Sequence, residues 1–398
     1  MKNIAVIGYG VIGKRVADAI NLQDDMNLIG VCDVISDWRI QNAMRKEYNI
    51  YAATAEAEKE MKTNGISVKG NLQGLLDKAD LVVDCTPKNI AAKNVIIYKK
   101  KGIKFIVQGG EKHETTNHSF SAENNYSSAL NLDATRVVSC NTTSILRTLT
   151  ALKRANLLDY ARGTLLRRAT DPWESHLGGI MNTMVPEKDI PSHQGPDAKS
   201  VDPDLDVITS AVKVPETLSH MHYWNVKLKK QATKDDVLNA FKTSSRIKLI
   251  RYDQGLVSNN TIKEMFLDMG RPWGDMYEVA LWEDMLKVVG DELFYAYVVD
   301  NQNIIELLGE KAAFYLEHVC EKITKDELQT PSKTSLDKVF TQSNRNSQVL
   351  RSLSQLYNHG NLGGTGYLSI LPVDQGIEHS ASYSFYKNPD YFDPENII

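Results

Sequence analysis

The chain has 398 residues, of which 42% are hydrophobic and 24% are charged, so it can bury a sizeable core and should hold at least two domains. Its formal net charge of −4 gives no overall basic field, which argues against nucleic acid as the main partner. No apolar run is long enough for a membrane span or a signal peptide, and the four cysteines lack metal-ligand or disulfide spacing. We therefore expect a cytoplasmic protein that binds no nucleic acid, membrane or metal.

The N-terminal stretch predicts a dinucleotide-binding unit. An apolar strand, residues 4–7, runs into three spaced glycines and then into a helical pattern, and these glycines are Gly8, Gly10 and Gly13. Glycines at this spacing make a tight turn, let the backbone approach a pyrophosphate and let the helix pack on the strand. A second strand, residues 28–32, is followed by Asp33, whose carboxylate suits a ribose 2′-OH.

Further strands of this unit end in small or polar residues. Helical stretches at 39–48 and 53–62 precede strands at 81–87 and 105–110. Because ligands bind at the carboxyl ends of strands in an open α/β sheet, we expect Thr86-Pro87, Gly109-Gly110 and Ser139-Cys140 to line one crevice.

Cys140 lies where a short β-branched strand changes into a helix with apolar residues at Ile145, Leu149 and Leu152. A free cysteine is often an inert core residue. Here the unpaired N–H groups and the dipole of the helix start should stabilise a thiolate. Small polar neighbours suited to an anion or oxyanion surround it, namely Ser139, Asn141, Thr142 and Thr143.

After Cys140 the pattern changes to long, antiparallel-looking strands at 205–214, 218–229, 246–252 and 292–299. Thr233 and Asp236 have the layout of a capping box, with Asp in place of Glu, and should start a helix to about Lys242. This part therefore predicts an α+β domain.

Two pairs of residues in the second domain carry further chemistry. Arg167 and Arg168 precede Asp171-Pro172, so one arginine is expected to face the crevice and the other a carboxylate; a guanidinium is a good phosphate clamp. His220 and His222 share one strand face, and one of them is expected to be a general base and the other a packing or hydrogen-bonding neighbour.

A thiolate, a nicotinamide site at the same sheet edge, a histidine base and anion-binding groups fit the oxidation of an aldehyde through a thiohemiacetal and a thioester. If phosphate is the acyl acceptor, two anion sites are needed. The candidates are Ser139, Thr142, Thr143, His193, Arg167 and Arg168.

Residues 1 to about 302 resemble the archaeal-type phosphorylating glyceraldehyde-3-phosphate dehydrogenases. The matching stretches are VIGYGVIGKRVADAI, VVDCTP, VQGGEKH, RVVSCNTTS, LRRATDP, the PSH around His193, and LSHMHYWN. The resemblance implies that Cys140 is the nucleophile and His220 the catalytic histidine, with glyceraldehyde 3-phosphate and inorganic phosphate as substrates and a homotetrameric assembly. The expected substrate contacts are Ser139, Asn141, Thr142, His193 and Gln194, and the expected cofactor contacts are Gly8, Gly10, Val11, Ile12, Gly13, Asp33, Gly110, Arg168 and Asn301.

Three positions depart from the family pattern. Gln194 stands where a second histidine is usual, and residues 176–179 read HLGG where basic residues precede a Gly-Pro. Asp33 stands where the family often has a basic residue and uses NADP. Because a carboxylate repels a 2′-phosphate, we expect NAD to be preferred over NADP.

Residues 304–398 resemble the start of the archaeal-type class I fructose-bisphosphate aldolases. A (β/α)8 barrel needs about 250 residues, and this stretch reaches only a first strand at 368–371, after a helix at 304–320. We therefore expect three parts: a Rossmann NAD(P)-binding domain at 1–139, a catalytic domain with a mostly antiparallel sheet at 140–302, and a truncated aldolase-like tail at 303–398.

Two alternatives to an active phosphorylating dehydrogenase stay open. The broken C-terminal barrel favours a non-catalytic fusion product that acts as an interaction scaffold. The nucleophile loop is also compatible with another thiol-dependent aldehyde dehydrogenase, such as a semialdehyde dehydrogenase.

Overall fold

The computed structural model describes residues 1–108, 110–170, 182–301, 346–359, 362–363 and 365. The chain divides into two compact units, Met1–Glu317 and His318–Ile398. In the second unit the described part contains one helix, α14 (Ser347–Tyr357). The expected helix at 304–320 and strand at 368–371 lie outside the described residues.

The first sheet is entirely parallel, in the order β4-β3-β2-β1-β5-β6-β8-β7. Its strands are β1 (Lys2–Ile7), β2 (Met26–Asp33), β3 (Ile50–Ala52), β4 (Val68–Asn71), β5 (Leu81–Asp84), β6 (Lys104–Val107), β7 (Ser119–Phe120) and β8 (Ala134–Val137). Its helices are α1 (Val11–Asn21), α2 (Trp38–Arg45), α3 (Ala55–Thr63), α4 (Leu72–Leu76), α5 (Ala91–Lys101) and α6 (Ala122–Ala129). The apolar sides of α1, α2 and α3 pack in one cluster and those of α4 and α5 in another, so the sheet is covered on both faces. This arrangement confirms the predicted α/β fold of the N-terminal part.

The second sheet is mixed and mostly antiparallel, in the order β10-β11-β9-β12-β16-β14-β13, with β15 paired to β16. Only the β9/β11 and β13/β14 pairs run parallel among these described strands. The strands are β9 (Leu158–Arg168), β10 (Val185–Pro186), β11 (Val207–Val214), β12 (His220–Leu228), β13 (Ile247–Ile250), β14 (Val279–Trp282), β15 (Lys287–Val289) and β16 (Glu292–Val299). Three further helices are α9 (Gln194–Lys199), α10 (Lys234–Lys242) and α11 (Asn259–Asp268).

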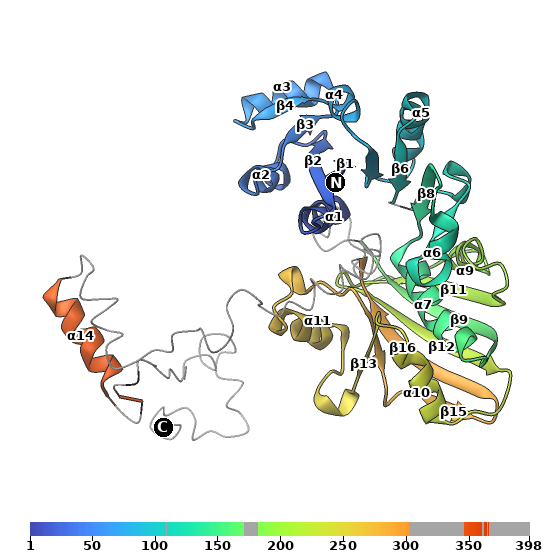
Figure 1. Ribbon diagram of the computed structural model, residues 1–398. Helices are drawn as coiled ribbons and strands as arrows, with labels where there is room; N and C mark the ends of the chain where they lie inside the picture. Colours follow the sequence, from blue (N-terminus) through green and yellow to red (C-terminus); the bar gives the residue numbers. More distant parts are fainter. Residues whose placement is uncertain (109, 171–181, 302–345, 360–361, 364, 366–398) are drawn as a thin grey trace. The chain divides into compact units, whose positions relative to one another are not determined.

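Helix α7 (Cys140–Arg154) links the two sheets and is buried from Cys140 through Leu152. Its apolar residues join those of α10, β9, β12 and β16 in the largest hydrophobic cluster. It also contacts α6 and α9 (Figure 1). The position of Cys140, its first residue, is therefore set both by α6, which packs with the first sheet, and by helices and strands of the second-sheet part.

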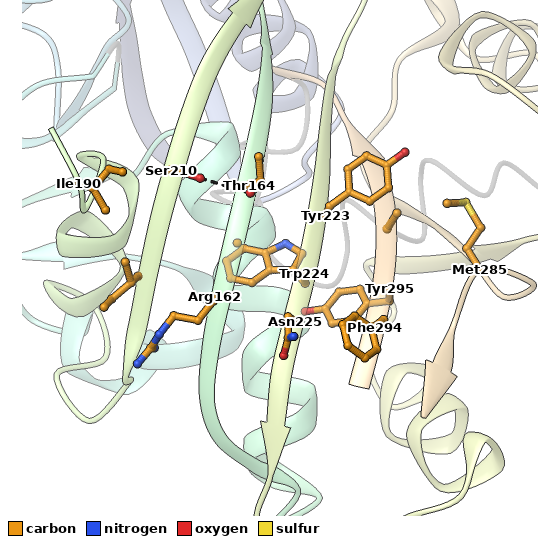
Figure 2. A pocket seen from close by; sticks show the side chains of 13 residues that line it. Arg162, Thr164, Ile190, Ser210, Tyr223, Trp224, Asn225, Met285, Phe294 and Tyr295 are labelled. Atoms are coloured by element: carbon orange, nitrogen blue, oxygen red, sulfur yellow. Dashed lines mark hydrogen bonds between the residues drawn. The ribbon is translucent and has the colours of Figure 1, made fainter. Parts of the chain in front are cut away.

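In the described part of the chain, the outer face of the second sheet is open over β11, β9, β12 and β16. Figure 2 shows the side chains of this face, which line a groove of about 500 Å³. Ile190, Ile208, Tyr223 and Phe294 on it are each more than a third exposed. This is an apolar surface of the kind that proteins use to meet another chain.

The segment from Arg271 to Glu278 joins the second sheet to the first. Asp275 accepts from Arg15 on α1 at 2.6 and 2.7 Å, and both side chains are buried. Tyr277 packs into the cluster under α1, and its carbonyl oxygen accepts from Arg147 on α7 at 2.7 Å. Helix α1, which follows Gly8 and Gly10, is thereby tied to α7.

The predicted strands and helices that fall in the described residues were confirmed to within a few residues, and the starts of several helices follow from capping. Helix α2 begins after Asp37, whose side chain accepts from the backbone N–H of Arg39, and α3 begins after Thr54, which accepts from Ala57. The capping box of Thr233 and Asp236 starts α10 as expected. Within the described residues no helix has the length and apolar character needed to cross a membrane.

Candidate active site

The glycine loop fits a dinucleotide. A Cβ on Gly8, which has φ +85°, would lie 2.8 Å from the backbone nitrogen of Thr86, and one on Gly13 would lie 1.8 Å from the Gly8 oxygen. Gly10 caps α1 without a side chain, and the first turn, which starts with Val11 and Ile12, holds no acidic residue. Nothing there competes with a pyrophosphate for the start of this helix.

Asp33 lies at the end of β2 and anchors the glycine loop. One carboxylate oxygen accepts from the Tyr9 backbone N–H at 2.5 Å, and the other accepts from Val34 at 2.6 Å. A carboxylate has about four acceptor positions, so Asp33 keeps capacity for a ribose hydroxyl. Gly110, the other expected glycine contact, has φ +80° and open space at its Cβ position. Gly109 lies outside the described residues.

Three cations near the glycine loop have different kinds of partner. Arg15 is paired with buried Asp275, and Arg39 is paired with Asp37 at 2.6 Å. Lys14 instead lies over the rings of Trp38 and Trp273, at 5.2 and 5.4 Å from their centroids, and both indoles are about half exposed. Burial and the neighbouring Arg15 lower the pKa of Lys14.

Cys140 is the first residue of α7, with Ser139 as the N-cap. Its thiol donates to Asn301 Oδ1 at 3.2 Å, and Asn141 Nδ2 donates to its sulfur at 3.8 Å. Burial raises the pKa of Cys140 to about 11, although the charge of Arg168 and the backbone N–H of Asn141 act to lower it. The expectation of a stabilised thiolate was therefore wrong for this state of the protein, because loss of solvent outweighs the helix start.

His220 is connected to Cys140 through a chain of buried contacts. Its Nδ1 accepts from the Arg168 backbone N–H at 3.1 Å, and the Arg168 guanidinium donates to Asp300 at 2.6 Å. Asp300 accepts from the backbone N–H of Asn301, which contacts the thiol. Burial, followed by the charge of Arg168, lowers the pKa of His220 well below its usual value. The ring is therefore neutral, and because Nδ1 accepts, its proton is on Nε2.

His222 is fully buried and contacts a different side of the site. Its Nε2 lies 2.8 Å from Asn141 Oδ1, and its Nδ1 lies 2.8 Å from the Tyr297 hydroxyl. Burial lowers the pKa of His222 to about 3. The two histidines thus share a strand face, as expected, but have separate partners.

Ser139 and Thr142 are held by a polar network that reaches α9. The Ser139 hydroxyl oxygen accepts from the Thr142 backbone N–H at 3.2 Å, and the Thr142 hydroxyl donates to Asp197 at 2.9 Å. Asp197 in turn pairs with buried Arg136. The Thr142 hydroxyl is therefore engaged within the protein, which favours a supporting role over direct contact with an anion.

Two other polar atoms beside this network are buried without a hydrogen-bond partner in the described part of the chain: Thr143 Oγ1 and Gln194 Nε2. The Gln194 side-chain oxygen is held by Ser192 at 2.8 Å, so its amide nitrogen is the atom left to donate. Such orphan atoms usually have an absent ligand or water as a partner. His193 is more than half exposed and pairs with Glu187.

The arginine pair differs from the prediction that one member would face the crevice and the other a carboxylate. Arg168 pairs with Asp300, and Arg167 pairs with Glu187 at 3.4 Å. Residues 171–181, which include the HLGG stretch, lie outside the described residues.

Three acidic residues in and near the site were not foreseen. Asp300 and Asp197 support Cys140 through the contacts above. Asp84 at the end of β5 is completely buried and accepts from Thr86, Asn94 and Tyr98, which fixes the loop against the glycine turn. The position of Asp84 at a strand end was the one available signal, since the arginine partners of Asp300 and Asp197 are distant in sequence.

Comparisons with known proteins show which families and folds the chain is similar to. A family model described as glyceraldehyde 3-phosphate dehydrogenase, C-terminal domain, matches residues 139–285, and one described as dihydrodipicolinate reductase, N-terminus, matches residues 2–125. The chain is similar in fold to aspartate semialdehyde dehydrogenase II from Vibrio cholerae, with a TM-score of 0.54 and 14% identity, covering 79% of this chain and 97% of that one.

Curated relatives are much closer in sequence. Glyceraldehyde-3-phosphate dehydrogenase 2 of Methanosarcina barkeri is 43% identical over 302 residues, which cover 76% of this chain and 88% of the relative. The glyceraldehyde-3-phosphate dehydrogenase of Methanothermus fervidus is 42% identical over 306 residues, which cover 77% of this chain and 90% of the relative. At this identity and coverage, the chain belongs to the glyceraldehyde-3-phosphate dehydrogenase family.

Proposed function

We propose that the chain oxidises glyceraldehyde 3-phosphate to 1,3-bisphosphoglycerate, with inorganic phosphate as the acyl acceptor and a nicotinamide cofactor. The observation that carries the proposal is the placement of Cys140 at the start of buried α7, in contact with two amide side chains, Asn141 and Asn301. A thiol in this setting suits attack on an aldehyde carbon.

Cys140 adds to the aldehyde: its sulfur bonds to the carbonyl carbon, and the thiol proton ends on the carbonyl oxygen, giving a thiohemiacetal. The bound nicotinamide supplies a hydride acceptor. Loss of the hydride from carbon and of the proton from oxygen leaves a thioester on Cys140. Phosphate oxygen then bonds to the acyl carbon, the carbon–sulfur bond breaks, and the sulfur recovers a proton.

His220 serves this sequence through Nε2. In the arrangement described, Nε2 carries the ring proton and donates a hydrogen bond, which suits stabilisation of an oxygen that gains negative charge. To accept the hydroxyl proton at Nε2, the ring must change tautomer and give up the hydrogen bond from Arg168. His220 therefore acts as donor first and as base only after that contact breaks.

The residues proposed to hold the cofactor are those of the glycine loop, the start of α1, Asp33, Gly110, Arg168 and Asn301. The loop is shaped for close backbone approach, and the Asp33 carboxylate repels an added 2′-phosphate. Arg15 and Arg39 are already paired with carboxylates, whereas Lys14 makes no ion pair with a described residue and lies over two indoles. We infer a preference for NAD over NADP.

The proposed substrate contacts are Ser139, Asn141, His193 and Gln194, with Thr142 supporting them through its bond to Asp197. Gln194 is the best supported of these, because its Nε2 is a buried donor that no described residue satisfies. Thr143 Oγ1 adds a second such atom. Both suit an anion with several acceptor oxygens, such as a phosphate.

We also propose that the chain forms a homo-oligomer, a tetramer as in the family that it resembles, through the open face of the second sheet. Tyr223 and Phe294 lie exposed beside the groove there (Figure 2). Tyr223→Glu should lower the molar mass measured by light scattering. An unchanged mass with the fold intact would place the interface elsewhere.

The test of the function is NADH formation from glyceraldehyde 3-phosphate with and without inorganic phosphate. Phosphate-dependent turnover that is lost in Cys140→Ser supports the proposal. Turnover with aspartate semialdehyde only would favour a semialdehyde dehydrogenase, and no turnover with either aldehyde would favour a scaffold. His220→Ala should reduce turnover more than His222→Ala, because only His220 is proposed to contact the reacting atoms.

We propose that the cofactor domain spans residues 1–139, the catalytic domain 140–302 and the tail 303–398. We propose that residues 303–398 supply nothing to the dehydrogenase site, so a chain cut after about Lys333 should keep its activity. Loss of turnover in that shortened chain would contradict this.

A further inference from the structure

His222 is a buried, ordered histidine to which the proposed chemistry gives no task. It is fully buried, packs against Tyr297 with ring centroids 4.8 Å apart, and uses both ring nitrogens. A polar side chain enclosed in this way has a role in fixing the groups it contacts. The group it contacts on the side of the active site is Asn141.

The hydrogen-bond directions in this contact follow from chemistry. Asn141 Oδ1 is an amide oxygen and can only accept, so His222 Nε2 must carry the proton. The neutral ring then has its lone pair on Nδ1, which accepts from the Tyr297 hydroxyl. The Tyr297 hydroxyl also lies 3.1 Å from the Ser144 hydroxyl, which donates to the Asn141 backbone carbonyl oxygen at 2.8 Å, and the shorter of the two Tyr297 contacts is the one to His222 Nδ1 at 2.8 Å.

This fixed direction decides which end of the Asn141 amide meets the nucleophile. With the oxygen held by His222, the amide nitrogen faces the Cys140 sulfur at 3.8 Å. The reversed amide would place its NH2 group against the Nε2–H of His222, donor against donor, and its oxygen against the sulfur. A donor beside the sulfur favours the thiolate, and an oxygen beside it disfavours the thiolate.

We propose that His222 is a positioning residue: together with Tyr297 it locks the Asn141 amide so that its NH2 group points at the Cys140 sulfur and promotes ionisation of the nucleophile. The proposal deepens the proposed function, since it concerns the same thiol. It needs no substrate to be tested, because ionisation of the thiol is a property of the free protein.

Two substitutions of His222 form a matched pair. A glutamine amide reaches the position of ring Nε2 and can still donate to Asn141, whereas an asparagine amide reaches only the position of Nδ1. Both are neutral, polar and smaller than histidine. A purely structural role for His222 would be disturbed by both substitutions, but only His222→Asn removes the donor.

The readout is the rate of iodoacetamide alkylation at Cys140, followed by mass spectrometry of the peptide that contains it across a pH series. Loss of one hydrogen bond to the thiolate should raise the thiol pKa by about one unit, so alkylation near pH 8 should slow about tenfold in His222→Asn. His222→Gln should stay within about threefold of the wild type on the same scale. Thermal unfolding of each variant controls for the fold.

Equal slowing in both variants, or no slowing in His222→Asn, would overturn the proposal. If His222→Asn does not fold, Tyr297→Phe decides, because it removes the donor to Nδ1 and keeps the ring. Slower alkylation in Tyr297→Phe is expected, and an unchanged rate would reject the lock. Failure of phosphate-dependent turnover in the wild type would instead count against the proposed function and would leave these alkylation rates as they are.

Discussion

Replacing Arg15 with methionine should strongly destabilise the protein, because Arg15 on α1 is the ion-pair partner of a buried carboxylate. The guanidinium makes two hydrogen bonds to Asp275 and lies 4.9 Å from the Trp273 ring centroid. Arg15 is 8% exposed and Asp275 1% exposed. Even with Arg15 present, burial raises the pKa of Asp275, so the carboxylate depends on this partner.

Breaking a buried ion pair from one side costs about 3–5 kcal/mol, because the remaining charge is left without a partner. We therefore expect Arg15→Met to lower the free energy of unfolding by about 3–5 kcal/mol at neutral pH. The double variant Arg15→Met/Asp275→Leu should recover most of this loss, since no buried charge then remains. Urea unfolding followed by circular dichroism measures both.

The control is Arg162→Met, because Arg162 on the open face of the second sheet makes a similar pair with Asp206. That pair is 2.9 Å long, but its side chains are 39% and 57% exposed. Its loss should cost less than about 1 kcal/mol. A cost for Arg15→Met as small as this would refute the reasoning.

The pH dependence gives a second check. Without Arg15, the pKa of folded Asp275 rises further above its unfolded value. A group with a raised folded pKa loses its contribution to stability as the pH rises, so the deficit should shrink as the pH falls toward about 4. A deficit that does not change with pH would show that Asp275 is not the group left unpaired.

Three further predictions concern the site. The rate of Cys140 alkylation should rise about tenfold per pH unit as the pH approaches the Cys140 pKa of about 11. The rate should still exceed that of Cys32, which is fully buried in the first sheet, and equal labelling of the two would argue against Cys140 as the nucleophile. Asp33→Ser should raise the affinity for NADP relative to NAD in fluorescence titrations, whereas an NADP preference in the wild type would assign the choice to Lys14. The pKa of His222 is about 3 in the folded protein and about 6.5 in the unfolded chain, so the contribution of His222 to stability is lost as the pH falls from about 6.5 to about 3. His222→Gln should therefore make the melting temperature depend less on pH across this range.

The sequence was informative wherever function depends on local backbone geometry. The glycine loop, Asp33 after the second strand, and Cys140 at the start of a helix all lie where spacing and strand-to-helix changes predicted them. These features depend on residues within a few positions of one another. A capping residue or a tight turn can therefore be recognised without knowledge of the fold.

Burial and distant partners could not be predicted in the same way. The helix start at Cys140 favours a thiolate, but the pKa of Cys140 is set by burial and by the charges of Arg168, Asp300 and Arg167, which lie far along the chain. Asp300 and Asp197 look like ordinary charged residues in the sequence. Their roles depend on Arg168 and Arg136, more than 60 positions away in each case. Strand β9 was missed for a related reason: its two ends carry polar residues, and pairing on both sides makes it central.

The enclosure of α7 also determines how the active site can fluctuate. An exposed loop can open locally while the rest of the protein stays folded, but α7 has contacts with α6, α9, α10, β9 and β16 around its whole circumference. Its amide hydrogens can then meet solvent only when much of the first unit unfolds. Hydrogen exchange along Cys140–Leu152 should thus be among the slowest in the chain, and inactivation by heat should coincide with loss of the fold rather than precede it.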